Sequence, residues 1–443
     1  MRFFRHILTF WAAGGLLLFG QNAFSQIADA DSSHFSGGGT AAGRQAFNPA
    51  HFELAASPEY AVRYERLAGV DVRFFVKNEH LQYRERYTAA AGRALEYLQA
   101  LYSKFPFDTL TMADAAPFDT TAWTFATPGV VHVPPGSWLV MDYSRLFEKH
   151  IFREIAAQYW SAGLSPKLDA QSWLLAGLAD YNAMRMLDVY YGRHANLIDH
   201  LGLTLSDFQY NRLLYLKQVM GESEMQYAHL FADLTKNDAA IRAKAALVWT
   251  TLGYWIGPQQ FERNLQTFYL QWRGKPPVLS NLLDICAQES GQNVRELVQQ
   301  FLESDPRADY MVAGLQSAPW RIETIPPDAI DLRSDDTSVS YLSTISLVRD
   351  GDVIFPVETE VAFTDGLKKR FTWDGMTRKK QLLLLYSSPA GSAMIDPDQM
   401  FLFDENFANN SMTAKSQLGD EKLLGRWIFM LQNVVILLTS FLG

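Results

Sequence analysis

The segment REIAAQYW, from Arg153 to Trp160, and the segment AGLADY, from Ala176 to Tyr181, decide our assignment of the fold. The first segment begins with the pattern R-E-x-x-A, and residues 158–175 separate that pattern from Ala176. Positions three and four residues apart lie on the same side of an α-helix. The pattern therefore predicts a helix with one distinct face, followed by a second helix that carries the AGLADY segment.

The distinct face of the first helix is narrow and polar. On a helical wheel, His150, Arg153, Glu154 and Ala157 fall within one arc of about 100°. The opposite side of the helix is apolar and consists of Ile151, Phe152, Ile155, Ala156, Tyr159 and Trp160. We therefore expect the apolar side to be buried and the narrow face to point away from it.

These two segments together resemble the HExxH-x18-E region of the M1 aminopeptidases. In this resemblance, Arg153 and Ala157 stand where the family has the two histidine ligands of zinc, and Ala176 stands where it has the glutamate ligand. Glu154 stands at the general base and is the family residue that is retained. The resemblance implies a thermolysin-like, mostly helical peptidase domain with a degenerate zinc site.

Two further elements of the family also differ in this sequence. The stretch TFATPGVVHV is similar to the family's GxMEN-like strand, and it places Ala126 where a glutamate binds the free amine of the substrate. The stretch RAKAALVW is similar to the YxKG helix, and it places Arg242 at the tyrosine that stabilises the tetrahedral intermediate. The resemblance therefore implies that metal, amine anchor and oxyanion donor have all been lost.

The residues at the three metal positions cannot form a zinc site. A catalytic zinc ion needs three protein ligands with lone pairs at about 2.0–2.3 Å. Methyl groups have no lone pairs, and an arginine is a permanent cation. We therefore expect no metal and no cofactor at this site. The alternative is a rebuilt zinc site made of His150, Glu154 and Asp180.

Charged residues take the place of the metal ligands in this region. Asp180 lies one helical turn beyond Ala176, so we predict an ion pair between Arg153 and Asp180 that replaces the charge of the metal. We expect Arg242 and Glu154 to lie nearby. This cluster either fills a collapsed pocket or forms a groove that binds carboxylates, because a guanidinium group matches a carboxylate in shape.

The rest of the chain predicts an α+β multidomain protein. Residues 140–310 are rich in helix-forming sequence, whereas residues 338–365 alternate as strands do around Asp350-Gly351, which predicts a hairpin turn. In chain order, we predict a signal peptide (1–25), a flexible linker (26–51), a remnant of an N-terminal β-domain (52–80), an M1-like domain (81–312), an Ig-like β-sandwich (320–412) and an apolar tail (413–443).

Composition limits the classes of partner. The net charge of −9 argues against nucleic acid, because the chain has no excess of basic residues to neutralise phosphates. A single cysteine, Cys286, excludes an internal disulfide framework. Arg2 and Arg5 precede an apolar run and small residues, which is typical of an export signal. The tail includes sixteen mostly apolar residues, 427–442, and predicts a short membrane anchor, a helix lying in the membrane interface, or a helix docked on the domain.

Together these features predict a protein of the periplasm or cell envelope. We expect an inactive peptidase homologue that binds a peptide or protein ligand or serves as a scaffold. The alternative is a zinc aminopeptidase with an atypical site.

Overall fold

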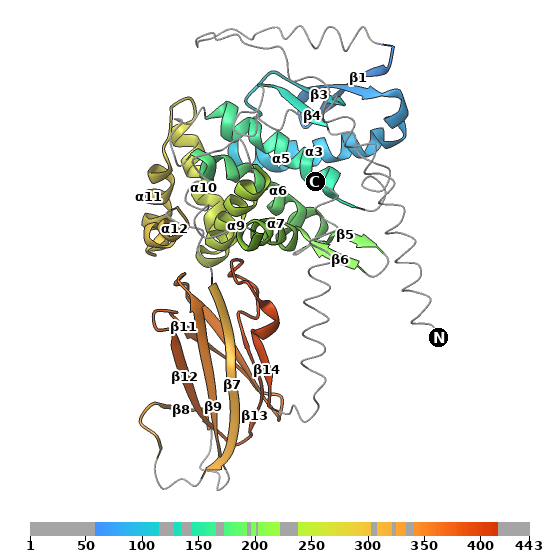
Figure 1. Ribbon diagram of the computed structural model, residues 1–443. Helices are drawn as coiled ribbons and strands as arrows, with labels where there is room; N and C mark the ends of the chain where they lie inside the picture. Colours follow the sequence, from blue (N-terminus) through green and yellow to red (C-terminus); the bar gives the residue numbers. More distant parts are fainter. Residues whose placement is uncertain are drawn as a thin grey trace, which may run out of the picture. The chain divides into compact units, whose positions relative to one another are not determined.

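The computed structural model describes residues 58–114, 128–133, 144–164, 172–192, 196–200, 203–221, 238–302, 308–320, 325–333 and 340–414 (Figure 1). All described residues belong to one compact unit, which spans residues 53–419. The predicted signal peptide, the linker and almost all of the predicted tail lie outside the described residues.

A four-stranded sheet begins the described part of the chain. Its strands, in spatial order, are β1 (Tyr60–Leu67), β2 (Val70–Lys77), β3 (Thr109–Asp114) and β4 (Val130–Val133). The first two strands form an antiparallel hairpin, while β3 lies parallel to both β2 and β4. Residues 60–77 therefore belong to the same sheet as the following strands. The predicted domain boundary at residue 80 stays a prediction, and backbone pairing joins strands from both sides of it in one sheet.

Helices follow the sheet and form most of the domain. They are α3 (Arg84–Tyr102), α5 (Leu146–Ala157), α6 (Ser172–Tyr191), α7 (Asp207–Gly221), α9 (Asp238–Ile256), α10 (Pro258–Trp272), α11 (Leu279–Ser290) and α12 (Val294–Leu302). A short 3-10 helix, η1 (Asn78–Tyr83), precedes α3. A small hairpin of β5 (Asn196–His200) and β6 (Leu203–Ser206) interrupts the helices. Helices α3 and α5 lie next to the first sheet (Figure 1).

Local sequence sets several of the helix ends. Pro258 is the first residue of α10, where its missing N–H costs no hydrogen bond, and Gly257 before it has a φ of 100°. Gly291 ends α11 in the left-handed conformation that glycine adopts without a steric penalty. These residues act as helix stop and start signals that can be recognised in the sequence.

The closest packing in the helical domain joins α6 to α9. A Cβ atom on Gly177 would lie 2.2 Å from the Cβ of Ala245, so a side chain does not fit there unless the helices move apart. The buried residues of α9 include Ala243, Ala245, Ala246 and Leu247, on different sides of the helix. A helix buried all round belongs to the centre of a domain. Small residues therefore allow α9 to occupy the centre of the helical domain.

The C-terminal part is a β-sandwich of two four-stranded sheets (Figure 1). One sheet contains β7 (Ala308–Trp320), β9 (Ser340–Gly351), β12 (Lys379–Tyr386) and β8 (Ala329–Asp331). The other contains β11 (Lys368–Trp373), β10 (Val357–Phe363), β13 (Ala390–Ile395) and β14 (Ser411–Thr413). The sandwich thus begins at Ala308, before the predicted boundary of 320.

The predicted hairpin at Asp350-Gly351 does not exist. Strand β9 pairs with β7 and β12, whereas β10 pairs with β11 and β13 in the other sheet. Gly351, with a φ of 85°, ends β9, and the chain then crosses between the sheets. A turn signal shows where a strand ends, but the next strand's partner depends on residues far away in the sequence.

The described residues therefore form an α+β protein with a helical domain and a β-sandwich. Of the helices that the structure describes, none has both the length and the hydropathy needed to cross a bilayer.

Candidate functional site: a buried charge cluster on helix α5

Helix α5 has the two faces that its sequence predicts. The side chains predicted to form its apolar side are all at most 2% exposed, and these are Ile151, Phe152, Ile155, Ala156, Tyr159 and Trp160. The last two lie in η3 (Gln158–Gly163), a π-helical turn that continues α5. Such turns widen a helix locally and are frequent at functional sites. The prediction of a buried apolar side is therefore confirmed.

Arg153 lies on the opposite side of α5 and is bound by two carboxylates. Its Nε lies 3.4 Å from Oδ2 of Asp180 on α6, and its Nη1 donates to Oε1 of the neighbouring Glu154. Arg153 is 9% exposed and Asp180 6% exposed, so the pair is largely withdrawn from water. The predicted ion pair between Arg153 and Asp180 is confirmed. We call Arg153, Glu154 and Asp180 the α5–α6 charge cluster.

The charge cluster keeps Glu154 ionised. Burial favours the neutral acid, but Arg153, His150 and Arg242 outweigh burial and lower the pKa of Glu154. At Arg153, burial favours the neutral form, but the carboxylates of Glu154 and Asp180 outweigh burial and raise the pKa of Arg153. Glu154 is therefore a stable anion with a weak affinity for a proton, which is the opposite of what a general base needs.

His150 has a partner on the first sheet. Its Nε2 lies 2.8 Å from the main-chain oxygen of His132 on β4, and a neutral imidazole that donates from Nε2 satisfies this contact. Burial lowers the pKa of His150, against the opposing effects of Glu154 and this hydrogen bond. The imidazole is therefore neutral at physiological pH, and it links α5 to the edge strand of the sheet.

Three other predicted positions complete the comparison with the sequence. Arg242 is half-buried on α9, and its charge lowers the pKa of both Glu154 and His150, so the structure brings it close to the charge cluster. Ala176 lies in α6, but its side chain is outside the described residues, as is the whole of Ala126. Five of the predicted site residues thus come together, namely His150, Arg153, Glu154, Asp180 and Arg242.

The residues of this site do not fit a zinc ion. Ala157 has only a methyl group to offer, Arg153 is a cation, and Glu154 already accepts a hydrogen bond from Arg153. No group of three or more His, Cys, Asp or Glu residues in the described part of the chain is arranged to hold a metal ion. The described residues at these positions therefore do not supply the zinc ligands of the HExxH pattern that the sequence resembles.

A second buried ion pair lies one turn earlier on α5 and was not predicted from the sequence. Lys149 Nζ lies 2.6 Å from Oδ1 of Asp207 at the start of α7 and donates to Oδ1 of Asn211 at 3.2 Å. Burial raises the pKa of Asp207, against the effect of Lys149. Lys149 and Arg153 are four residues apart, so the i,i+4 spacing is a signal that α5 presents two cations on one side.

Gln158 is a further residue whose role the sequence alone did not reveal. Its side chain is fully buried, its Oε1 accepts from the N–H of Gly129 at 2.9 Å, and its Nε2 donates to the oxygen of Val130 at 3.0 Å. Gln158 therefore fixes the beginning of edge strand β4 against the end of α5. Its place directly after the R-E-x-x-A pattern was the available signal.

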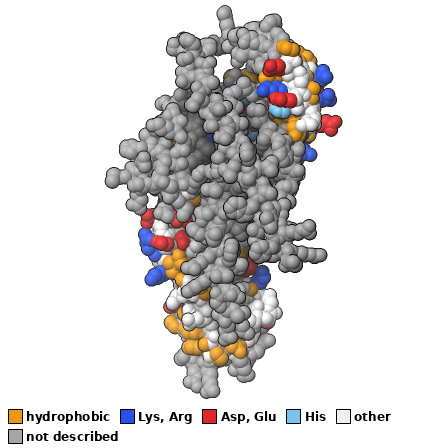
Figure 2. Space-filling model, turned by 45° about the vertical axis from the view of Figure 1, so that its right-hand side comes forward, with side chains coloured by type: hydrophobic (Ala, Val, Ile, Leu, Met, Phe, Trp, Pro, Cys, Tyr) orange, Lys and Arg blue, Asp and Glu red, His pale blue; other side chains and the backbone are white. Residues whose placement is uncertain are grey.

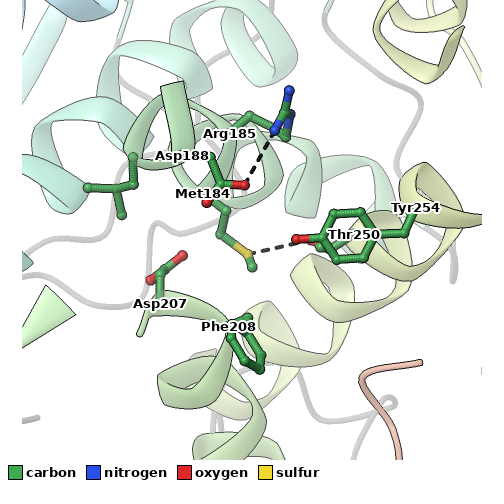
Figure 3. A pocket seen from close by; sticks show the side chains of 8 residues that line it. Met184, Arg185, Asp188, Asp207, Phe208, Thr250 and Tyr254 are labelled. Carbon is green, nitrogen blue, oxygen red and sulfur yellow. Dashed lines mark hydrogen bonds and ion pairs between the residues drawn. The ribbon is translucent and has the colours of Figure 1, made fainter. Parts of the chain in front are cut away.

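A small pocket lies elsewhere, between α6, α7 and α9 (Figure 3). It is lined by Met184, Arg185, Leu187, Asp188, Asp207, Phe208, Thr250 and Tyr254. Inside it the hydroxyl of Thr250 lies 3.5 Å from the sulfur of Met184, and Arg185 pairs with Asp188 at 3.3 Å. None of the predicted site residues lines this pocket. The charge cluster and the pocket are therefore separate features.

Comparisons with known proteins bear on the fold. No protein-family model matches this sequence, and no curated protein matches it. Among solved structures, Legionella pneumophila aminopeptidase A in complex with aspartic acid is similar, with a TM-score of 0.52 and 12% sequence identity. The fold of this chain is similar to that of this aminopeptidase. The match covers 83% of this chain but only 39% of the other, and at this identity the likeness concerns the fold alone.

Surface charge in the described residues is mixed. Figure 2 shows one side of the molecule, where the visible acidic and basic side chains of described residues are interspersed. This view shows no patch of a single sign among them, and the predicted absence of nucleic-acid binding stays a prediction.

Proposed function

We propose that this protein is an M1 peptidase homologue with a thermolysin-like helical domain whose zinc site has degenerated. It acts by binding a peptide or protein ligand, or as a scaffold, in the cell envelope. The observation that carries the proposal is the position of Arg153. In the M1 resemblance this residue replaces the first zinc ligand, and its guanidinium lies between the carboxylates of Glu154 and Asp180.

The charge cluster favours binding over hydrolysis for an electrostatic reason. A metallopeptidase needs a Lewis acid that polarises the carbonyl group and activates a water molecule. Arg153 supplies positive charge but has no coordination site, and it also lowers the pKa of Glu154, the residue at the general-base position. In the M1 resemblance, Arg242 also replaces the tyrosine that stabilises the tetrahedral intermediate. At these positions the described residues therefore offer neither a metal ligand set nor the tyrosine that catalysis of this type uses.

The contacts of Arg153 within its own chain indicate which kind of ligand is favoured. Arg153 already contacts two carboxylates of its own chain, so an external carboxylate would have to displace one of them. A ligand that binds along the surface of the aminopeptidase-like domain does not face this cost. We therefore favour a peptide or protein ligand outside the charge cluster over a carboxylate bound to Arg153.

The direct test measures zinc and hydrolysis on the same purified sample. We expect substoichiometric zinc by inductively coupled plasma mass spectrometry and no hydrolysis of aminoacyl substrates with added zinc. Stoichiometric zinc together with hydrolysis would establish the alternative, a zinc aminopeptidase with an atypical site. The retained Glu154 and the aminopeptidase-like fold are the observations that favour this alternative.

A reconstruction tests the family assignment itself. The triple variant Arg153→His, Ala157→His and Ala176→Glu restores the three ligands of the M1 pattern, and we expect it to bind one zinc ion per chain. The matched control adds Glu154→Gln, which removes the carboxylate at the general-base position but none of the ligands, and should keep the zinc. Failure of a folded triple variant to bind zinc would argue against the M1 assignment.

The cellular location is a separate part of the proposal. The basic and apolar N-terminal sequence supports export, and the apolar sequence of residues 427–442 supports membrane contact. N-terminal sequencing of the protein recovered from the envelope should begin near Gln26. Recovery of the full N-terminus from the cytoplasm would exclude export.

A further inference from the structure

Helix α7 is joined to the β-sandwich by a buried arginine. Arg212 is 4% exposed, and its Nε donates to the main-chain oxygen of Asp404 at 2.8 Å, while its Nη2 donates to the same oxygen. The guanidinium carbon lies 4.1 Å from the ring centre of Phe407. Next to Asp404, Phe403 contacts Phe301 of α12 at 4.3 Å between ring centres. The residues around Asp404 thus form one part of the contact between the helical domain and the sandwich, and we call this part the Asp404 junction.

The carboxylate of Asp404 organises this junction. It is 1% exposed, and its Oδ1 accepts from the N–H of Asn406 at 2.9 Å. Its Oδ2 accepts from the N–H of Tyr310 at 3.2 Å and from Nδ2 of Asn410 at 3.1 Å. Tyr310 lies near the start of β7, the first strand of the sandwich. Asp404 therefore binds the start of β7 through its carboxylate and Arg212 of α7 through its main-chain oxygen.

Negative charge exceeds positive charge around Asp404. Asp309 faces it from β7, Glu405 follows it in the chain, and Asp350 lies beyond Asp309. Arg212 faces Asp404 from α7, but the Nε and Nη2 groups of Arg212 donate to the main-chain oxygen of Asp404 and not to its carboxylate. Burial and then Asp309 raise the pKa of Asp404 to about 7, despite the opposing hydrogen bonds and Arg212.

The junction also contains a group ready to receive a hydrogen bond from a protonated carboxyl. Within the described residues, Oδ1 of Asn410 is buried and has no hydrogen-bond partner, although Nδ2 of the same amide donates to Asp404. A reversed amide would present Oδ1 to the O–H of a protonated Asp404, because the two ends of the amide have similar shape. Asn409 repeats the arrangement: its Nδ2 donates to Asp309 at 2.9 Å and its Oδ1 is unpaired.

We propose that Asp404, Asn410 and Arg212 form a proton-sensitive junction, in which a proton on Asp404 strengthens the attachment of α7 to the β-sandwich. Loss of the proton places an additional buried anion beside Asp309 and weakens the attachment. This inference is independent of the proposed function, because it uses none of the residues of the charge cluster.

The direction of the pH dependence follows from proton linkage. Asp404 binds a proton more tightly in the closed junction than in an open one, where its pKa returns towards the ordinary value of 3.8. The closed junction is therefore most stable below this ordinary value and loses stability as the pH rises to about 7. Within this window the ratio of open to closed junction rises about tenfold per pH unit, and it levels off above neutrality.

Hydrogen exchange of the full chain, followed by mass spectrometry from pH 5 to 8.5, tests the proposal. Peptides from α7 and from the start of β7 report the junction, after correction for the intrinsic pH dependence of exchange. We expect their opening to increase from pH 5 to 7 and then to level off, and we expect Asp404→Asn to remove this increase. A wild-type protein without the increase, or an Asp404→Asn variant that keeps it, would overturn the proposal.

Three further variants keep the test decisive if Asp404→Asn does not fold. Arg212→Met removes the charge that lowers the pKa of Asp404, so the pH at which the opening levels off should rise. Arg212→Lys keeps the charge and should leave this pH close to the wild-type value. An unchanged levelling-off pH in Arg212→Met would contradict the inference.

Asp396→Asn is the matched control, because Asp396 is a buried acid that accepts hydrogen bonds from the N–H groups of Met400 and Phe401 within the sandwich. This control should leave the exchange of α7 unchanged.

Discussion

The α5–α6 charge cluster and the Asp404 junction both place a buried carboxylate beside a buried arginine, yet the two carboxylates respond in opposite ways. The pKa of Glu154 is lowered, whereas the pKa of Asp404 is raised to about 7. In the cluster, Arg153 donates directly to a carboxylate oxygen. In the junction, Arg212 donates to a main-chain oxygen. The placement of the donors, more than the presence of an arginine, decides whether a buried acid stays ionised.

The arginines reflect the same difference. The pKa of Arg153 is raised because two carboxylates more than offset its burial. Burial lowers the pKa of Arg212 to about 10, although Asp404, Glu405 and Asp309 oppose this change. A buried charge is stable where hydrogen bonds reach the opposite charge directly. In the charge cluster, Arg153 donates directly to a carboxylate oxygen of Glu154. In the Asp404 junction, Arg212 donates to a main-chain oxygen, so the two opposite charges are not joined by a hydrogen bond.

The largest expected effect is the loss of the cation from the charge cluster. Arg153→Met leaves Glu154 and Asp180 buried without their partner, so we expect the free energy of unfolding at pH 7 to fall by about 3–5 kcal/mol. Urea denaturation measures this change. The control is Arg66→Met, which breaks an exposed pair with Asp71 and should cost about 0–1 kcal/mol. Equal effects in the two variants would contradict a buried, coupled cluster.

The junction should give a comparable effect that depends on pH. Because the folded-state pKa of Asp404 is raised, its contribution to stability is complete below its ordinary pKa and is lost as the pH rises through about 7. The difference in unfolding free energy between wild type and Asp404→Asn should therefore change by roughly 3 kcal/mol between pH 4 and pH 8. Thermal unfolding across this range measures it. A constant difference would show that Asp404 titrates normally in the folded protein.

A third variant separates packing from charge at the helix pair that carries Asp180. Gly177→Ala forces a methyl group against Ala245, and such overpacking should cost about 1–3 kcal/mol at every pH. Gly92→Ala in α3 is the control, because nothing lies within 4 Å of its new Cβ, and it should gain about 0.5–1 kcal/mol. If both variants were equally stable, α6 and α9 would not approach each other as closely as they do here.

The smallest expected effect is the change in the free energy of unfolding at acidic pH when Glu154 is replaced. The folded-state pKa of Glu154 is lowered, so its contribution to stability is present above its ordinary pKa of 4.5 and is lost as the pH falls through the folded value. Glu154→Gln removes a charge-assisted hydrogen bond and should cost about 1–2 kcal/mol at pH 7, and less as the pH falls. Acid titration of the fluorescence of the two proteins tests this. The two profiles should converge at low pH.

Much of the charge cluster could be predicted because its residues follow helical spacing. The faces of α5 depend on the sequence positions within one helix, and Asp180 lies on the same face of α6 as Ala176. Lys149 and Asp207 were missed because Asp207 belongs to α7, whose position relative to α5 has no local signal. The crossing from β9 to β10 was missed for a similar reason: Asp350-Gly351 predicts a turn but not the sheet that the next strand joins.

The junction could not be found from the sequence at all. Arg212 and Asp404 are separated by 192 positions and belong to different parts of the protein. Neither residue lies in a recognisable motif. Their contact depends on packing between the helical domain and the sandwich, which includes the ring contacts of Phe403 with Phe301 and of Phe355 with Trp255.

By itself, the sequence determined which helix faces are buried, which residue types occupy the former metal positions, and that a strand-rich region follows the helices. These features depend on local periodicity and on the chemistry of single side chains. Only the tertiary structure decided that residues 60–77 extend the first sheet, that β9 and β10 belong to different sheets, and that Glu154 and Asp404 differ in proton affinity. The physical reason is that strand pairing and desolvation depend on neighbours in space, which the chain supplies from distant positions.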